Sequence, residues 1–426
     1  MNITIELQET LREGVLENIE LNKIEHLVDN RPLMVAEMNR IMEKVAEQQG
    51  TWLSAPIQLA MAELMADEII GFGPLRPLLD DDSISDILVN GPEKIFIERA
   101  GKLELTSCRF INNAQLTDIA KRMVQRVGRR LDEGRPLVDA RLADGSRLNV
   151  AIAPVALDGT CISIRKFGKR NLEFSDLIQS GAMTSQMANF LMIAARCRVN
   201  IIISGGTGSG KTTLLNALSK FIDEGERIIT MEDAAELRLM QPHVLRMETR
   251  LAGVENTGQI TMRALLINAL RMRPDRIIVG ECRGEEAFEM LQAMNTGHDG
   301  SMSTLHANNP RDAISRLENM VMTAGMNIPM ESIRRNIVSA VNVIIQVSRL
   351  NDGSRKIMSI SEVVGVEGDR VILQDIFVFQ SESDRDEKGR IKGKFINNGL
   401  LVRSKVMQNA VMFNVSQELK HIFGME

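Results

Sequence analysis

The sequence predicts an α/β protein whose main domain contains a mostly parallel sheet, preceded by an α+β domain and a small helical bundle. Three observations predict this. From residue 183 onward, short β-branched runs alternate with helical stretches, a pattern typical of parallel strands covered by helices. Between 65 and 168 short strands joined by glycine turns dominate. The first 64 residues instead repeat apolar residues at helical spacing.

Residues 1–64 are predicted to form a helical bundle. Apolar residues recur every four positions in 11–19 and again in 34–42. Pro32 should separate the first two helices, and Ser54-Ala55-Pro56 should begin a third.

Residues 65–168 are predicted to form the α+β domain. An amphipathic helix is expected over 114–131, and the stretch 169–182 is expected to be a linker. The β-like runs of this domain lie at 84–91, 94–105, 137–142, 147–153 and 161–167.

The main domain is predicted over 183–360, followed by a strand-rich appendix over 361–426 with a charged, polar loop. Its strands are expected at 200–204, 227–231, 244–247, 276–280, 301–305 and 342–347.

Composition excludes several function classes. The 426 residues are 44 % hydrophobic, an ordinary globular value. A net charge of −5 and a shortage of aromatic residues, with thirteen Phe, one Trp and no Tyr, argue against a nucleic-acid partner. No apolar run reaches the roughly 18 residues of a membrane span. The N-terminus lacks the basic and apolar regions of a signal peptide. The four cysteines, at 108, 161, 197 and 282, show no metal-ligand spacing and predict reduced thiols in a cytoplasmic protein.

One motif predicts phosphate binding. Gly205-x4-Gly210-Lys211-Thr212 fits the P-loop pattern, with an apolar strand before it and a helix after it. Loop N–H groups and the helix N-terminus attract phosphate. Lys211 should reach the β- and γ-phosphates, and the Thr212 hydroxyl should bind Mg²⁺. The predicted nucleotide-binding residues are Gly205, Gly206, Thr207, Gly208, Ser209, Gly210, Lys211, Thr212 and Thr213.

Acidic residues and histidines follow other predicted strands. Glu281 directly follows the strand 276–280, where a P-loop fold needs a carboxylate for Mg²⁺ or water. Glu232 follows the strand 227–231 and could activate water, or could be a structural acid at a helix N-terminus. His298 and His306, within a polar stretch, suggest a further element near the site. A GTPase is excluded because the one Asn-Lys pair, Asn22-Lys23, lies upstream and lacks the required Asp.

Together these motifs resemble the secretion-ATPase superfamily, the motors of type II and type IV secretion and of type IV-like pili. The Walker A motif, Asp box, Walker B motif and His box of that family are matched by 205–212, 228–236, 276–281 and 297–306. Longer stretches such as "NALRMRPDRIIVGECRG" and "TGHDGSMSTLHANNPRDA" are similar to the CpaF-like ATPases of Tad/Flp pilus assembly. The resemblance covers about 65–350.

The resemblance implies a RecA-like P-loop NTPase domain that binds ATP and Mg²⁺ in a cytoplasmic homohexamer. Such a motor is peripherally associated with the inner membrane through platform proteins of a pilus or secretion machine, with no direct membrane insertion and no nucleic acid. Two alternatives stay open: a P-loop nucleic-acid translocase, and a nucleotide-dependent scaffold or regulator.

The resemblance also implies roles for individual residues. Arginines of the N-terminal domain act on the γ-phosphate, with Arg147 first, Arg141 second and Arg165 third in expectation. Glu232 becomes the expected general base and Glu281 the Mg²⁺-side carboxylate, although the base role stays open between them. His306 is expected to sense the γ-phosphate.

Overall fold

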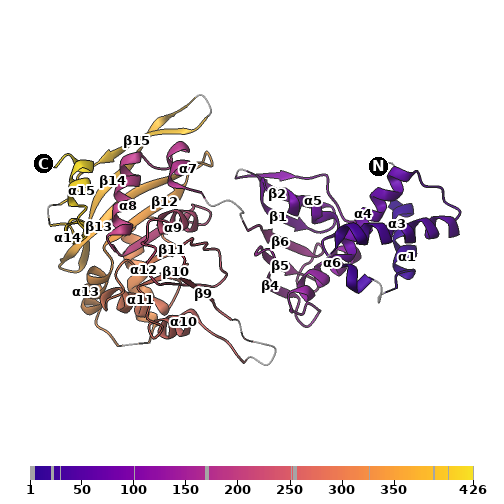
Figure 1. Cartoon of the computed structure of the whole chain (residues 1–426), viewed down its shortest axis with the longest axis horizontal. Helices are drawn as coiled ribbons and strands as arrows, with labels where there is room; N and C mark the ends of the chain where they lie inside the picture. The colour runs from indigo at the N-terminus through magenta and orange to yellow at the C-terminus, as the bar shows by residue number, and fades with distance from the viewer. Residues whose placement is uncertain are drawn as a thin grey trace. The chain divides into compact units, whose positions relative to one another are not determined.

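The computed structural model describes residues 5–20, 24–28, 30–99, 101–167, 172–250, 252, 257–325, 327–386, 389–401 and 403–425. The chain divides into two compact units, Met1–Lys169 and Arg170–Glu426 (Figure 1). Within the described ranges, no helix combines the length and the apolar character needed to cross a membrane.

The first unit begins with the predicted helices. They are α1 (Ile5–Glu17), the short 3-10 turn η1 (Glu25–Leu27), α3 (Arg31–Gln48) and α4 (Ala55–Ile69). The Asn30 side chain caps α3, and Pro32 and Pro56 occupy the first turns of α3 and α4. This placement is favourable because the missing N–H of proline has no partner there in any case. The boundary expected at residue 64 falls inside α4.

The rest of this unit is a twisted antiparallel sheet with one covering helix. Its elements are η2 (Gly73–Leu75), α5 (Arg76–Asp80), β1 (Ile84–Asn90), β2 (Lys94–Arg99), β3 (Lys102–Leu105), α6 (Asn113–Arg126), β4 (Leu137–Arg141), β5 (Arg147–Ala151) and β6 (Cys161–Arg165). The described strands are ordered β3-β2-β1-β6-β5-β4. The predicted helix ends at Arg126 rather than at 131, because Gly128 adopts a left-handed φ of +70° just beyond it.

A buried carboxylate joins the helical region to the sheet. Glu68 of α4 accepts hydrogen bonds from Arg12 Nε of α1 at 2.8 Å and from Gln115 Nε2 of α6 at 2.6 Å. Only 2 % of Glu68 is exposed, so its charge depends on these partners. The helical region and the α+β region therefore pack as one unit.

The second unit contains one large sheet. Its first half comprises α7 (Phe174–Gln179), α8 (Ser185–Arg196), β7 (Ile201–Gly205), α9 (Lys211–Ser219), β8 (Ile228–Glu232), β9 (Val244–Glu248), α10 (Met262–Ala269), β10 (Arg276–Val279) and α11 (Glu286–Asn295). Its second half comprises β11 (Met302–Leu305), α12 (Pro310–Thr323), α13 (Met330–Ala340), β12 (Val343–Arg349), β13 (Arg355–Glu367), β14 (Arg370–Arg385), β15 (Ile391–Asn397), α14 (Lys405–Met412) and α15 (Ser416–Phe423).

The described strands of this unit follow the order β15-β14-β13-β12-β7-β11-β10-β8-β9. The six strands from β12 to β9 are parallel, whereas β13, β14 and β15 are added antiparallel to one another and to β12. All five residues of β7 are buried, as expected for a central strand of a parallel sheet covered on both faces. The predicted fold class, a mostly parallel sheet with helical cover, is therefore confirmed.

Two apolar cores separate the helices into layers. One core joins α7, α8, α9, α14 and α15 to one face of the sheet, and the other joins α10, α11, α12 and α13 to the opposite face. The stretch predicted as a linker contains α7, whose Phe174 packs against Phe221 with ring centroids 4.8 Å apart. The predicted strands beyond residue 361 continue the same sheet, and α14 and α15 then return to its face (Figure 1).

Candidate active site

Four neighbouring parallel strands carry the predicted site residues to one edge of the sheet. In spatial order these strands are β7, β11, β10 and β8. At their carboxyl ends lie the P-loop, His306, Glu281 and Glu232, in that same order. Ligands of open α/β sheets bind at the carboxyl ends of strands. The topology thus groups motifs that are far apart in the sequence.

The P-loop has the backbone that its glycines predict. Gly208 and Gly210 have left-handed φ values of +67° and +98°, which only glycine adopts without strain. A Cβ on Gly205 would lie 2.4 Å from the carbonyl oxygen of Val347, so no larger residue fits. Thr207 at the tip of the loop is exposed, which leaves the loop open to a ligand. The helix α9 starts directly after the loop, with Thr212 and Thr213 half-buried in its first turn.

The Lys211 ammonium lies within the loop. Its Nζ donates to the carbonyl oxygens of Gly205 at 3.0 Å and Gly206 at 3.1 Å. The same Nζ is 3.3 Å from His306 Nε2. Burial lowers the pKa of Lys211, whereas the nearby Glu281 charge raises it. A lysine that is largely desolvated beside a loop of N–H groups is well placed to bind an anion.

Glu281 lies next to His306 and between two cations. Its Oε1 is 3.0 Å from His306 Nε2, and its Oε2 accepts from Arg283 Nη2 at 2.8 Å. Burial raises the pKa of Glu281, but the Arg283 hydrogen bond and the charges of Arg283, His306 and Lys211 outweigh it, so the pKa lies below its usual value. Burial and the Lys211 charge lower the pKa of His306. Glu281 is therefore an anion at neutral pH beside a neutral imidazole.

Glu232 has the opposite electrostatic environment. It is 4 % exposed, and its Oε1 accepts from the backbone N–H groups of Glu236 at 2.8 Å and Leu237 at 2.9 Å. Among the described residues, none hydrogen-bonds to its Oε2. Burial raises the pKa of Glu232 to about 7. A Cβ on Gly280 would lie 2.6 Å from Glu232 Cγ, so this side chain packs against the residue before Glu281.

These two neighbouring acids therefore have pKa values displaced in opposite directions, a pattern found where acid and base roles are divided. The alternative interpretation, an acid at a helix N-terminus, does not fit Glu232, since residues 233–243 are all described and contain no helix.

The raised pKa of Glu232 predicts a pH-dependent stability. At Glu232 the folded chain binds more protons than the unfolded chain between pH 4.5 and about 7, so this group makes the free energy of unfolding fall as pH rises through this window. We expect Glu232→Gln to remove this fall, and to be more stable than wild type at pH 8 by an amount on the order of 2 kcal/mol. Denaturant titrations at pH 4.5 and pH 8 measure it. A stability difference that is equal at both pH values would contradict the prediction.

The residues predicted for Mg²⁺ fit that ion chemically. Magnesium prefers oxygen ligands and is commonly held by one or two protein groups together with substrate phosphates. Thr212 supplies a hydroxyl in the first turn of α9, and Glu281 supplies a carboxylate kept ionised by its neighbours. These two side chains would hold the ion, which would neutralise charge on the phosphates.

The three predicted arginines lie in the first unit, as one row. Arg147 on β5 is directly opposite both Arg141 on β4 and Arg165 on β6. Like charges directly opposite in a sheet are destabilising. Asp139 is 3.6 Å from Arg147, and Asp86 is 3.1 Å from Arg165, which offsets part of this repulsion. The row lies on the sheet face opposite the buried residues that pack against α6. Their contact with the P-loop stays a prediction.

Sequence reasoning missed two kinds of residue. Arg283 links two acids: its Nη2 donates to Glu281, and its Nη1 donates to Asp233 at 3.2 Å. The sequence signal that could have identified Arg283 is local, because it is a basic residue two positions after Glu281. Arg355 of β13 donates to the Gly208 carbonyl oxygen at 2.9 Å. No sequence motif around Arg355 predicts this contact.

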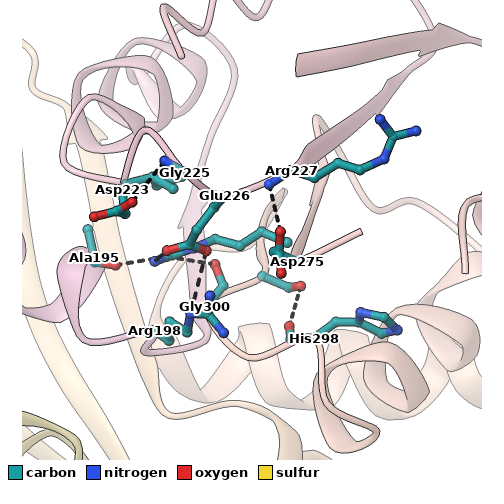
Figure 2. Close-up of polar contacts among 12 residues, drawn as sticks. Ala195, Arg198, Asp223, Gly225, Glu226, Arg227, Asp275, His298 and Gly300 are labelled. Atoms are coloured by element: carbon teal, nitrogen blue, oxygen red, sulfur yellow. Dashed lines mark hydrogen bonds and ion pairs between the residues drawn. The ribbon is translucent and has the colours of Figure 1, made fainter. Parts of the chain in front are cut away.

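The opposite edge of the sheet holds a structural polar cluster. Arg276, fully buried at the start of β10, donates its Nε and Nη2 to Glu226 at 2.6 and 2.8 Å. Figure 2 shows Glu226 at this edge with Ala195, Arg198 and Gly300. His298 also lies here, with Nδ1 2.9 Å from the carbonyl oxygen of Pro274. Since β11 separates it from His306, the polar element brings His306, but not His298, to the phosphate-binding edge.

A strand, a glycine loop and a helix at the centre of a parallel sheet define a P-loop nucleotide-binding fold. Residues 68–422 match the family described as Type II/IV secretion system protein, and the chain belongs to this family.

Individual relatives agree with this membership. The chain is 36 % identical over 316 residues to a Mycobacterium tuberculosis protein whose name assigns it provisionally to conjugal transfer, covering 73 % of this chain and 89 % of that one. It is 33 % identical over 320 residues to the type IV secretion system protein VirB11 of Brucella suis, covering 68 % and 88 %. The crystal structure of the ATPase DotB of Yersinia pseudotuberculosis superposes with a TM-score of 0.50 at 16 % identity, over 84 % of this chain and 86 % of that one, a likeness of fold.

Proposed function

We propose that this chain is an ATP-hydrolysing hexameric motor of the CpaF-like group. It powers the assembly, or both assembly and retraction, of a Tad/Flp type IV-like pilus, or drives type II/IV secretion. One observation carries the proposal: His306, at the end of β11, contacts both Lys211 of the P-loop at 3.3 Å and Glu281, which follows the adjacent strand β10, at 3.0 Å.

Each residue has a chemical role in this proposal. Lys211 holds the β- and γ-phosphates of ATP, while Thr212 and Glu281 hold Mg²⁺. Glu232 takes a proton from the attacking water, and its pKa of about 7 matches the value at which a base works best at neutral pH. His306 contacts both Lys211 and Glu281, so it responds to occupation of the γ-phosphate position.

The proposal includes partners and location. Arg147, Arg141 and Arg165 complete the nucleotide site, and the alignment of three positive charges across neighbouring strands supports an anionic ligand. The motor is a cytoplasmic homohexamer, held at the inner membrane by platform proteins of the pilus or secretion machine. The VirB11 relative, which is a type IV secretion system protein, supports this setting.

Replacing Glu232 with glutamine separates the two acids. Glutamine keeps an oxygen that accepts the Glu236 and Leu237 N–H groups, but cannot take a proton. We expect ATP binding to persist and turnover to fall by about 100-fold. Glu281→Gln should instead also shift the Mg²⁺ dependence of turnover, because it removes an expected ligand.

The matched control is Glu362→Gln. Glu362 is also buried, and its pKa is also raised. Its Oε1 accepts hydrogen bonds from the Ser404 hydroxyl and the Lys405 backbone N–H, at the N-terminal end of α14. We expect normal turnover from this variant. If Glu232→Gln weakens ATP binding as much as turnover, Glu232 is structural.

The proposed motor should assemble and hydrolyse ATP without nucleic acid. The arginines of the first unit have no substrate until a nucleotide site is closed, so ATP with Mg²⁺ should favour the hexamer. Light scattering and phosphate release, measured on the purified chain in the same buffer, test both points. A monomer in every nucleotide state at micromolar concentration would contradict the motor, and turnover only with DNA would favour the translocase.

A second candidate is the motor of a conjugal transfer machine. The name of the Mycobacterium tuberculosis relative favours it, as does 32 % identity to the conjugal transfer protein TrbB of Rhizobium radiobacter. Deletion of the gene decides between the two candidates. Loss of pili with normal plasmid transfer supports the pilus motor, and the reverse supports conjugation.

A further inference from the structure

The hairpin formed by β12 and β13 lies beside the P-loop. The strand β12 runs parallel to β7, and Val347 pairs with Gly205, the first residue of the P-loop motif. It continues two residues farther, to Arg349, which carries it about 7 Å beyond the end of β7. Because β11 flanks β7 on the other side, this hairpin borders the loop on the side away from His306.

Two arginines of the hairpin approach the loop. Arg355 Nε donates to the carbonyl oxygen of Gly208 at 2.9 Å. A Cβ on Gly208 would lie 3.7 Å from Arg349 Nη1, and one on Gly210 would lie 3.5 Å from Arg355 Cδ. The hairpin therefore contacts the loop at the two glycines whose backbone is left-handed.

The two arginines also face each other across the hairpin. Arg349 and Arg355 are directly opposite each other in the hairpin register, and both are exposed. Like charges directly opposite repel, and the Arg355 guanidinium is directed to the backbone of the loop, at the Gly208 carbonyl oxygen.

We propose that Arg355 is a positioning residue for the phosphate-binding loop. A loop that directs its N–H groups at a phosphate directs carbonyl oxygens the other way, and these need donors. Arg355 supplies a charged donor to one such carbonyl, that of Gly208, and so holds residues 208–210 in the phosphate-binding conformation. The inference rests on the proposed nucleotide site and adds a residue that acts on it from a hairpin distant in sequence.

Arg355→Met is the informative variant, because methionine keeps most of the stem that packs at Gly210 and removes the guanidinium. We expect ADP to bind about tenfold more weakly and the KM for ATP to rise about tenfold, the scale for losing a charged hydrogen bond. The kcat should stay within about twofold, because the loop is ordered again once nucleotide is bound. Arg355→Lys keeps a charged donor and should recover ADP affinity to within about threefold of wild type. The thermal midpoint without nucleotide should not change.

Arg385→Ala is the matched control, since Arg385 Nη1 donates to the Gly389 carbonyl oxygen at 2.9 Å from an exposed position on β14. It should leave ADP affinity unchanged. Wild-type ADP affinity in Arg355→Met, or an equal loss in Arg385→Ala, overturns the positioning role while the proposed motor stands. A lower kcat at constant KM also overturns it. A wild-type chain that binds no ADP overturns the motor and this inference together.

Discussion

Replacing Lys211 with alanine is expected to reduce ATP turnover by about 10³-fold or more, the scale for removing a charge that stabilises a transferring phosphoryl group. In the structure the Lys211 ammonium contacts the carbonyl oxygens of Gly205 and Gly206 and the His306 ring. Removing it takes away both the charge on the β- and γ-phosphates and the link from the loop to His306. Phosphate release at saturating ATP measures the effect.

The fold should survive this change. The Lys211 contacts are made to the loop itself, whereas the packing of α9 rests on apolar residues such as Leu214, Leu215 and Leu218. We expect the thermal midpoint without nucleotide to change little. Lys220→Ala is the matched control, because Lys220 ends the same helix and pairs only with Glu173 among the contacts described, at 2.6 Å. Turnover within about twofold of wild type in Lys211→Ala would remove the P-loop from the mechanism.

The central features of the site were predictable because their signals are local. The P-loop glycines precede a helix, Glu232 ends an apolar strand and Glu281 lies two residues after another, so sequence and fold agree without long-range information. The neighbouring order of these strand ends was not predictable. It depends on β11 lying between β7 and β10, which places His306 between Lys211 and Glu281.

Contacts made over long sequence separations escaped prediction. Arg355 lies almost 150 residues from Gly208, and only the register of β12 against β7 brings the hairpin to the loop. His298 is the converse case. It is near His306 in sequence, but an intervening extended strand carries the two rings to opposite edges. Sequence proximity across a strand thus predicts separation, whereas proximity across a tight turn predicts contact.

The role of the three arginines stays a family-based prediction, and the sheet register shows how they are arranged. Arg141, Arg147 and Arg165 come from three strands, yet the register places them directly opposite one another. Arg147 occupies the middle and has like charges on both sides, a repulsion that Asp139, 3.6 Å away, offsets in part. This middle position makes Arg147 the most informative of the three arginines to replace.

Arg147→Ala is expected to reduce kcat by about 10³-fold, as for an arginine that stabilises charge developing during phosphoryl transfer. ADP affinity should barely change, because ADP lacks the γ-phosphate on which the arginine acts. The thermal midpoint should stay equal or rise slightly, since removing the middle charge relieves repulsion from Arg141 and Arg165. Arg147→Lys should recover activity only in part, because lysine keeps the charge but not the planar guanidinium.

The opposing interpretation is a surface ion pair with Asp139, at 3.6 Å and half-exposed, which would contribute about 0–1 kcal/mol. That interpretation predicts normal kcat and a slight loss of stability. Arg99→Ala is the matched control, because Arg99 is a partly exposed arginine of the same sheet that pairs with Asp81 and Glu104 at 2.8 and 3.1 Å. Arg99→Ala should retain wild-type kcat, and an equal kcat in Arg147→Ala would show that Arg147 does not act on the nucleotide.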